Sequence, residues 1–411
     1  MGIKGLIPEL RKTTPSAFAN RNVKDYQGGW VVIDAMNVMF IYMAVAQKKT
    51  VGETKLVMGE KVDHVKAQQK MMKMLVDYIV KFVANGVAPL FVFDGLDKKE
   101  KSQTTDERKR KKQVIVDEIK ELEKKLVPID SLDFSSIKPD TMIIAQRLSN
   151  LLNQVPYLTD EDIFAFQEIL AACGLPFLTA KGEGEKLCSS ICVHGYARAV
   201  VSCDSDNLAF GCPRVMISTT NDPLVFSEVT LNTVLYELKQ AYPGMDTFSK
   251  FVDMCIMCGC DFNTNIRNIG IKKSIGLLSK HGSIEGVAAS GIDVSCLRHE
   301  ICREIFKDVD PNSLIQDDRQ LDEILVLDKS FEGSRDTFER YEIEPDKIIL
   351  FLKNLEVEVG LRMETFPAPV PPYTFTGPAE VEVQQPEHAT VDSLVSRLGV
   401  DQDLLSLLTF S

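Results

Sequence analysis

The sequence predicts an α/β fold with a mainly parallel central sheet flanked by helices. Three short apolar runs, at residues 30–33, 89–93 and 197–201, are rich in β-branched or aromatic residues and are typical of buried strands. An acidic residue or an acidic pair follows each run, and helical patterns separate the runs. Because the ligands of such sheets bind beyond the carboxyl ends of the strands, these acids are the first candidates for a functional site.

The segments between the strands favour helices. Residues 66–83 carry apolar side chains near helical spacing, and Asn85-Gly86 is a typical helix end. The chain after Asp261 favours helices through about residue 355. Residues 96–157 depart from the α/β pattern, because they open with a long charged run, and they predict exposed helices that project from the core.

Composition limits the class of protein. The chain has 411 residues, 45% of them hydrophobic, which suits a globular protein with a sizeable core. A formal net charge of −12 argues against a protein that coats nucleic acid with a uniform positive field. The most apolar stretch, residues 38–46, is far shorter than the roughly 20 residues that span a bilayer, and the N-terminus lacks the apolar core of a signal peptide. We expect a soluble intracellular protein with no membrane partner.

The cysteines allow two interpretations. All 10 lie between Cys173 and Cys302, and the group Cys255-x-x-Cys258-x-Cys260 resembles half of a zinc site. A structural zinc site needs a second pair of ligands at suitable spacing, and the isolated histidines do not supply one. Buried, reduced thiols are the favoured interpretation.

Seven acidic residues follow predicted strands, open a predicted helix or follow an apolar run. Taken singly, an Asp at a strand end is more often a helix cap or turn residue, and an acid in a first helical turn is favoured by the helix dipole. Jointly, three strand ends and one helix start would aim six carboxylates at one crevice. The seven are Asp34, Asp94, Glu183, Glu185, Asp204, Asp206 and Asp261.

Such a cluster predicts a site for divalent cations, because carboxylates that repel one another are costly unless cations neutralise them. Oxygen ligands suit Mg²⁺ or Mn²⁺. The sequence has no histidine-rich set for zinc and no glycine-rich loop of the nucleotide-phosphate type. An all-carboxylate site fits phosphoryl chemistry, in which two ions about 3.5–4 Å apart bind the phosphate and activate water.

Residues 98–112 reverse the charge of the chain locally. They hold eight lysines and arginines against three acids, in a protein of net charge −12. A solvated charged face is the bland explanation, and a surface that binds phosphates is the interpretation we favour.

Seven ordered blocks carry a resemblance to a known family. They are MGIKGL at 1–6, IDA at 33–35, FVFDG at 91–95, GEGE at 182–185, CDSDNLAFG at 203–211, MCGCDF at 257–262 and RNIGIKK at 267–273. From residue 1 to about 330 the chain resembles the structure-specific 5′ nucleases, which include flap endonuclease, exonuclease 1 and the xeroderma-group nuclease. The likeness leans toward flap endonuclease, although residues 204–212 are equally similar to exonuclease 1.

The resemblance implies a PIN-like nuclease core with a helical arch and a helix–turn–helix DNA element. It implies that the seven acids hold two Mg²⁺ ions, directly or through water, with Mn²⁺ as a substitute. The basic pair of the arch corresponds to Lys101 and Arg108, seven residues apart and so on one helix face. These two cations would polarise the scissile phosphate beside the metals, and Asp204 is the acid we expect to be indispensable for cleavage.

The resemblance also implies the DNA contacts. Gly2 would lie in a buried N-terminus beside the active site, and Phe40 would stack on a nucleotide, with a core aromatic as the alternative. Residues 266–273 would present a turn to duplex phosphates, with Gly270, Lys272 and Lys273 as contacts and a monovalent cation such as K⁺ in the turn. The first glycine of that turn is replaced by Asn268, a residue type that tolerates left-handed backbone.

We expect five regions along the chain. They are an N-terminal nuclease region (1–95), the arch (96–157), an internal nuclease region (158–330) that contains the DNA element at about 252–290, a helical extension (331–366), and a linker with a terminal helix (367–411). The segment between Asp94 and Glu183 is longer than the resemblance leads us to expect. Near the C-terminus Gln402 begins a sequence that only partly resembles a sliding-clamp motif, so a different partner or tail packing is the favoured alternative.

The sequence therefore predicts a Mg²⁺-dependent 5′ flap endonuclease with 5′–3′ exonuclease activity, acting as a monomer in DNA replication or repair, in the nucleus or another site of replication. Two other functions remain open: a mainly exonucleolytic enzyme, and a catalytically silent protein that binds DNA junctions. A small-molecule phosphatase is disfavoured, because it has no use for the basic run or for the DNA element.

Overall fold

The computed structural model describes residues 2–50, 63–95, 102–125, 139–154, 158–218, 224–317 and 320–325, together with residues 337 and 340. Within α5 and α6 the side chains of 102–109, 111, 112, 139, 153 and 154 are not described. The expected linker and terminal helix at 367–411, and nearly all of the extension at 331–366, lie outside these ranges. The sliding-clamp motif lies there too.

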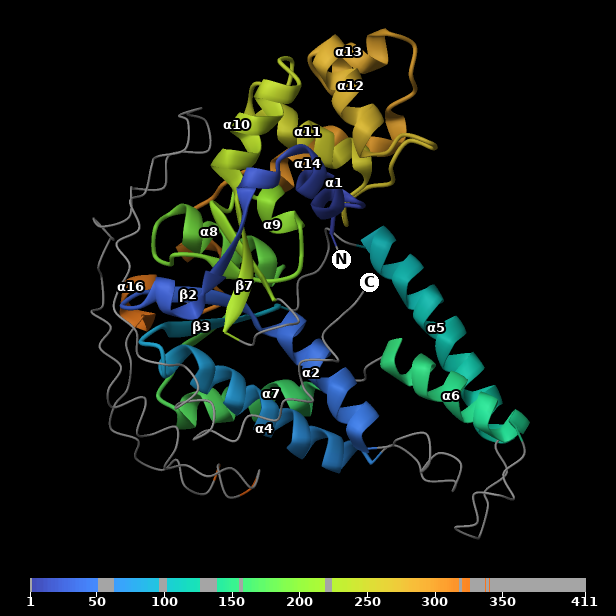
Figure 1. The fold of residues 1–411 in the computed structure, drawn as a ribbon, viewed down its shortest axis with the longest axis vertical. Helices are drawn as coiled ribbons and strands as arrows, with labels where there is room; N and C mark the ends of the chain where they lie inside the picture. The colour runs from blue at the N-terminus through green and yellow to red at the C-terminus, as the bar shows by residue number, and fades with distance from the viewer. Residues whose placement is uncertain are drawn as a thin grey trace.

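A seven-stranded sheet forms the centre of the protein (Figure 1). Its spatial order is β1-β7-β6-β5-β2-β3-β4. The five strands from β6 to β4 are parallel, and β7 pairs antiparallel with both β6 and β1. The prediction of a mainly parallel sheet is confirmed. The strands are β1 (Phe18–Asn22), β2 (Trp30–Asp34), β3 (Ala88–Phe93), β4 (Phe177–Thr179), β5 (Val200–Val201), β6 (Arg214–Ser218) and β7 (Val225–Thr230).

The middle strands are buried on both faces, which explains their unbroken apolar sequences. Every residue of β2 and β3 is buried. The third predicted strand is shorter than expected, because only Val200–Val201 forms β5. The pairing nevertheless extends upstream, since the Arg198 amide donates to the Trp30 carbonyl (2.8 Å) and the Val32 amide donates to the Ala199 carbonyl (3.0 Å).

The order of the strands places a switch point beside β2. After β2 the chain adds β3 and β4 on one side, and it then returns to add β5 on the other. Connections from neighbouring strands therefore diverge at the carboxyl ends of β2 and β5, where doubly wound sheets bind their ligands.

Helices cover both faces of the sheet. On one side lie α2 (Ala35–Thr50), α4 (His64–Val83) and α7 (Asp160–Ala172), and on the other lie α8 (Gly184–Val193), α9 (Asp206–Ala209) and α10 (Leu231–Ala241) (Figure 1). The helix expected at 66–83 begins two residues earlier, because Asp63 accepts a hydrogen bond from the Lys66 amide and caps it. Near the N-terminus, α1 (Leu6–Thr13) packs against α10. Short 3-10 helices span Pro15–Ala17, Val23–Tyr26 and Ser295–Leu297.

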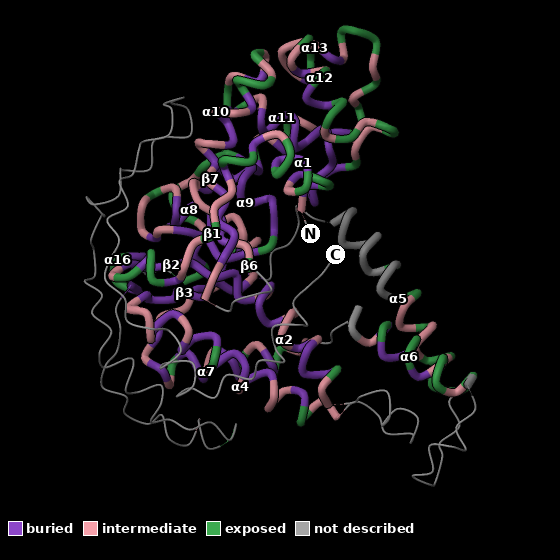
Figure 2. The backbone as a smooth tube through the Cα atoms, viewed as in Figure 1, coloured by how far each residue is buried: buried purple, intermediate pink, exposed green. Residues whose placement is uncertain are grey.

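Two helices project from the core as a hairpin, α5 (Ser102–Lys125) and α6 (Pro139–Gln154) (Figures 1 and 2). They pack against each other, Arg147 pairs with Glu118 (2.9 Å), and α6 also packs against α2. The expected exposed helices are therefore present.

The chain after β7 is mainly helical as far as residue 325, which confirms the expected helices after Asp261 to that point; most of the expected helical stretch from 326 to 355 lies outside the described residues. It forms α10, α11 (Phe248–Cys258), α12 (Ile271–His281), α13 (Ile284–Ala289) and α14 (His299–Phe306), followed by the short α15 (Pro311–Leu314) and α16 (Leu321–Ile324). The turn between α11 and α12 keeps a left-handed residue at the position of the missing glycine, since Asn268 has φ +63°.

All ten cysteines are free thiols and eight of them are buried, as the favoured interpretation predicts, whereas Cys203 and Cys296 are exposed. Cys255, Cys258 and Cys260 are all buried, and burial raises the pKa of Cys258 to about 12. The metal-ligand group found among the described residues contains no cysteine. In the same part of the chain, no helix has the length and apolar character needed to cross a bilayer.

A partly buried ion network of Arg303, Asp253 and Glu285 joins α11, α13 and α14. The Arg303 guanidinium donates to both carboxylate oxygens of Asp253 on α11 (2.7 Å each) and to both of Glu285 on α13 (2.6 and 3.2 Å). Asp253 is 2% exposed. These hydrogen bonds lower the pKa of Glu285 to about 2 from an ordinary value of 4.5.

We expect Arg303→Met to lower the free energy of unfolding by about 3–5 kcal/mol, because it leaves the Asp253 charge buried without its partner. Lys307→Met, which removes an exposed charge near the end of the same helix, should change it by no more than about 0.5 kcal/mol. Denaturant titrations measure both values, and equal effects of the two substitutions would contradict this role of Arg303.

The ion pair between Arg303 and Glu285 makes the free energy of unfolding depend on pH. Because the pKa of Glu285 is lowered by folding, its contribution is fully present above pH 4.5 and is lost as the pH falls toward 2. The Arg303→Met variant should therefore lose less stability than the native protein over that interval.

Candidate metal centre

The topology brings acids from distant parts of the sequence to one edge of the sheet. Asp34 ends β2, Asp94 follows β3, and Asp204 follows β5. Because these strands are parallel and adjacent, their carboxyl ends meet at the same edge. The N-terminus of α8, with Glu183 as its cap residue and Glu185 in its first turn, adds two further acids.

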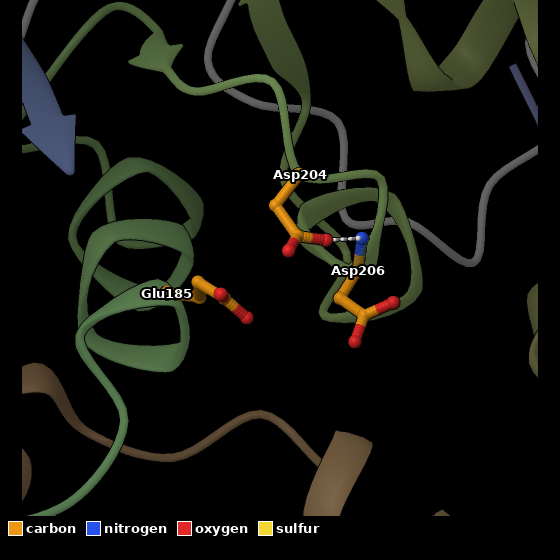
Figure 3. A group of neighbouring side chains, drawn as sticks. All are labelled: Glu185, Asp204 and Asp206. Carbon is orange, nitrogen blue, oxygen red and sulfur yellow. Dashed lines mark hydrogen bonds between the residues drawn. The ribbon is translucent and has the colours of Figure 1, made fainter. Parts of the chain in front are cut away.

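Three of the acids form a compact group. Carboxylate oxygens of Glu185, Asp204 and Asp206 all lie within 4.8 Å of one another. Figure 3 shows Glu185 on α8 extending toward the two aspartates. Asp204 is 2% exposed and Asp206 is fully buried, and the Asp206 amide donates to Asp204 Oδ1 (3.0 Å). This donor helps to fix the Asp204 carboxylate.

Two more acids border this group and are held by backbone amides. The Asn37 amide donates to Asp34 Oδ1 (3.0 Å), and the Gly184 amide donates to Asp94 Oδ1 (2.9 Å). Burial raises the pKa of the Cys188 thiol on α8, and the negative charges of Asp34, Glu185 and Asp94 raise it further. Acids that follow β2 and β3 and an acid on α8 therefore lie close enough to raise the pKa of the same thiol, Cys188.

Glu183 and Asp261 are near the edge of the site but outside the compact group. Glu183 precedes α8, and Asp261 is a buried residue (4% exposed) that follows the end of α11. The sequence analysis gave all seven acids one common role. In the structure, three of them lie close enough to share one metal ion, and the other four lie on neighbouring segments of the chain.

The donor set fits a hard divalent cation. All three members of the compact group offer oxygen, two of them are buried, and nothing softer than a carboxylate lies within the group. Like charges so close in a low-dielectric site are stabilised by a bound cation. An ion held there would act as a Lewis acid toward a phosphate oxygen.

The N-terminal segment packs directly against this group. Gly2 has φ +84°, and a Cβ atom built on it would lie 2.1 Å from Asp204 Oδ1 and 2.8 Å from Asp206 Oδ1. The Ile3 amide donates to Ser205 Oγ (2.9 Å), and the Lys4 amide donates to the Gly259 carbonyl (3.4 Å). The segment therefore joins the loop of Asp204 and Asp206 to the corner that precedes Asp261.

Three polar residues of the site were missed in the sequence. Ser205 binds the N-terminal segment, and Ser202 Oγ accepts from the Asp204 amide (3.1 Å) and lies 3.5 Å from Asp34 Oδ2. The Asn37 side chain contacts the Cys203 sulfur (3.0 Å). Their contacts join residues at least 166 positions apart or lie within one tight loop. No local sequence pattern distinguishes such serines and asparagines from ordinary turn residues.

The other predicted residues occupy varied positions. Phe40 lies on α2, is partly exposed and is not part of the hydrophobic core, which removes the main alternative to a binding role. Arg108 lies on α5 in the part whose side chains are not described, and Lys101 lies outside the described residues.

The turn before α12 contains the remaining predicted contacts. Gly270 is the N-cap residue of α12, with extended backbone. Lys272 Nζ lies 3.8 Å from Glu9 Oε1 on α1, and Lys273 Nζ donates to the Asn268 carbonyl (2.9 Å). Both lysines are exposed.

Comparison with known proteins gives a consistent set of relatives. Residues 1–115 match the model of the XPG N-terminal domain, and residues 174–261 match that of the XPG I-region. The flap endonuclease 1-B of Oryza sativa subsp. indica is 30% identical over 293 residues, 70% of this chain and 63% of the rice protein. The chain thus spans a little less than two thirds of that relative. The flap endonuclease 1 of Naegleria gruberi is 27% identical over 353 residues, 82% of this chain and 83% of that protein.

Two solved structures share the fold. The catalytic core of Rad2 in complex with a DNA substrate aligns with a TM-score of 0.53 and 15% identity, covering 86% of this chain and all of that one. The flap endonuclease-1 of Methanococcus jannaschii aligns with a TM-score of 0.50 and 21% identity, covering 82% of this chain and 98% of that one. At these identities the likeness concerns the fold, which is that of a PIN-like nuclease core.

We expect Gly2→Ala to weaken binding of Mn²⁺ at the acid cluster, because its methyl group would overlap Asp204 Oδ1 and displace the N-terminal segment. Calorimetric titration with Mn²⁺ measures the effect, and a drop of about tenfold or more in affinity is the expected size for a displaced supporting group.

Gly5→Ala is the matched control. Gly5 also has a left-handed backbone (φ +73°), but a Cβ atom there meets nothing within 4 Å. It should cost about 1 kcal/mol of stability and leave the Mn²⁺ affinity unchanged. Equal Mn²⁺ affinities for the two variants would rule out the proposed close approach at Gly2.

Proposed function

The chain belongs to the XPG and flap endonuclease family of structure-specific 5′ nucleases, and we propose that it is a divalent-metal-dependent 5′ flap endonuclease with associated 5′–3′ exonuclease activity. The observation that carries the proposal is the compact group of Glu185, Asp204 and Asp206 at the switch point of the sheet. Matches to both family models, at residues 1–115 and 174–261, support it.

The cofactor of the proposed reaction is Mg²⁺, with Mn²⁺ as a substitute. Glu185, Asp204 and Asp206 would hold the metal directly, and Asp34, Asp94, Glu183 and Asp261 would complete a two-ion site, directly or through water. The ions supply Lewis-acid activation of the phosphate and of the attacking water. The chain's own part is to fix the carboxylates, which the amides of Asn37, Gly184 and Asp206 do in advance.

DNA binding would combine three surfaces. The turn before α12, with Gly270 and Lys272, would meet backbone phosphates of the duplex, and the basic residues at 98–112 would meet the single strand. Phe40, partly exposed on α2, would stack on a nucleotide near the scissile bond. Recognition would then depend on junction shape and on phosphates, with little dependence on base sequence.

Lys101 and Arg108 are proposed as the cations that polarise the scissile phosphate. This role rests on the resemblance of the arch and on the charge of the 98–112 run. The intact acid cluster favours an active enzyme over a silent junction-binding protein. Action as a monomer inside the cell, at sites of replication or repair, belongs to the same proposal.

Cleavage of a labelled 5′ flap duplex in Mg²⁺ tests the function. We expect the native protein to release the flap and Asp204→Asn to reduce the single-turnover rate by about a thousandfold, because a metal ligand is lost. Junction binding should remain measurable in the variant. Asp160→Asn, at an exposed acid in the first turn of α7, should cleave normally. No cleavage by the native protein with Mg²⁺ or Mn²⁺ would overturn the proposal.

A second substitution tests the arch. Lys101→Ala should slow single-turnover cleavage by about a hundredfold while changing duplex affinity little, since one preorganised charge on the phosphate is removed. Lys125→Ala, at the far end of α5, is the control and should leave the rate unchanged. An unchanged rate in Lys101→Ala would refute its catalytic role without affecting the assignment of the metal site.

A further inference from the structure

In the turn that joins α11 to α12, most backbone carbonyls accept hydrogen bonds from groups of the turn itself or of α12. The Ile266 carbonyl accepts from the Ile269 amide (3.0 Å), and the Gly270 carbonyl accepts from the amide and the hydroxyl of Ser274 (3.0 and 3.1 Å). The Asn265 side-chain amide lies within hydrogen-bond distance of the Ile266 and Ile269 carbonyls (3.4 and 3.3 Å). Each donor occupies one of the two lone pairs of its carbonyl oxygen and so reduces what that oxygen can offer to an added cation.

The remaining contact comes from a charged side chain. Asn268, in left-handed conformation, offers its carbonyl to the ammonium group of Lys273, and the N–O distance is 2.9 Å. A bond from an ammonium group to a carbonyl is charge-assisted and therefore stronger than a neutral one. Lys273 thus brings one positive charge to the turn from the first helical turn of α12.

We propose that Lys273 is the cation of this turn and that the turn needs no monovalent cation from solution. This inference rests on the proposed function for its DNA-binding consequence, and it differs from the K⁺ site that the sequence resemblance implied. The residues present do not fit a K⁺ site well, because Asn265, Ser274 and Lys273 supply donors to four of the five carbonyls from 266 to 270. Lys273 is then a positioning residue of the turn and is not a phosphate contact.

The neighbouring lysine provides a matched comparison. Lys272 carries the same charge one residue earlier, but within the described part of the chain its ammonium group pairs with Glu9 Oε1 on α1 (3.8 Å) instead of with the turn. Replacing either lysine with methionine removes one charge and keeps most of the aliphatic chain. Only Lys273→Met removes the donor to Asn268.

Duplex binding in two salts distinguishes the role of Lys273 from that of Lys272. Native protein, Lys272→Met and Lys273→Met are titrated with a labelled nicked duplex without divalent ions, in KCl and in tetramethylammonium chloride at equal ionic strength. We expect native protein to have the same duplex affinity in both salts. We expect the affinity of Lys272→Met to be independent of the salt in the same way. Lys273→Met should bind the duplex about fivefold more weakly than native protein in tetramethylammonium chloride, the size of one net hydrogen bond, and KCl should restore its affinity to the native level.

Either of two results overturns the inference. The first is a duplex affinity of native protein that falls several-fold when K⁺ is replaced, and the second is a Lys273→Met variant whose affinity changes between the salts no more than that of Lys272→Met. The midpoint of thermal unfolding in the two salts decides the inference without DNA, since only Lys273→Met should be stabilised by K⁺. If native protein binds no duplex in either salt, the proposed function fails, and the unfolding comparison still decides the role of Lys273.

Discussion

Repulsion between carboxylates that the fold holds close together is the constraint on which the rest of the site depends. Glu185 lies in the first turn of α8, whereas Asp204 and Asp206 follow β5, and one carboxylate oxygen of each lies within 4.8 Å of the other two. Left alone, these charges would favour protonation or separation. Amides from Asn37, Gly184 and Asp206 hold the carboxylates of Asp34, Asp94 and Asp204 in place, and a divalent cation would supply the balancing positive charge.

The N-terminal segment carries this constraint into the surrounding structure. Gly2 approaches the acids as only a residue without a side chain can, and Ile3 and Lys4 tie the Asp204 loop to the corner at Gly259. From there α11, α13 and α14 are joined through Arg303. A net charge of −12 is therefore a poor guide to the partner, because acids gather at the proposed cation site and basic residues gather where phosphate is expected.

The sequence was sufficient for the middle of the sheet and for the acids at its edge. Strands β2 and β3 are buried on both faces, so their unbroken apolar runs were recognisable, and parallel topology then forces Asp34, Asp94 and Asp204 to one edge. Strands β1, β6 and β7 were not predicted because they carry polar residues, and β4 was not predicted because it has only three residues. The bond between Ile3 and Ser205 joins residues 202 positions apart, and the contact from Lys273 to Asn268 depends on one side-chain rotamer. Local patterns contain neither.

The most direct test of the central claim is the position of a metal in crystals grown with Mn²⁺. Anomalous scattering from manganese locates the ion independently of any activity. The arrangement of the carboxylates predicts a peak bounded by Glu185, Asp204 and Asp206, at oxygen-ligand distances from all three. Crystals saturated with Mn²⁺ that show no peak between these residues would contradict the assignment of a metal centre to this edge of the sheet.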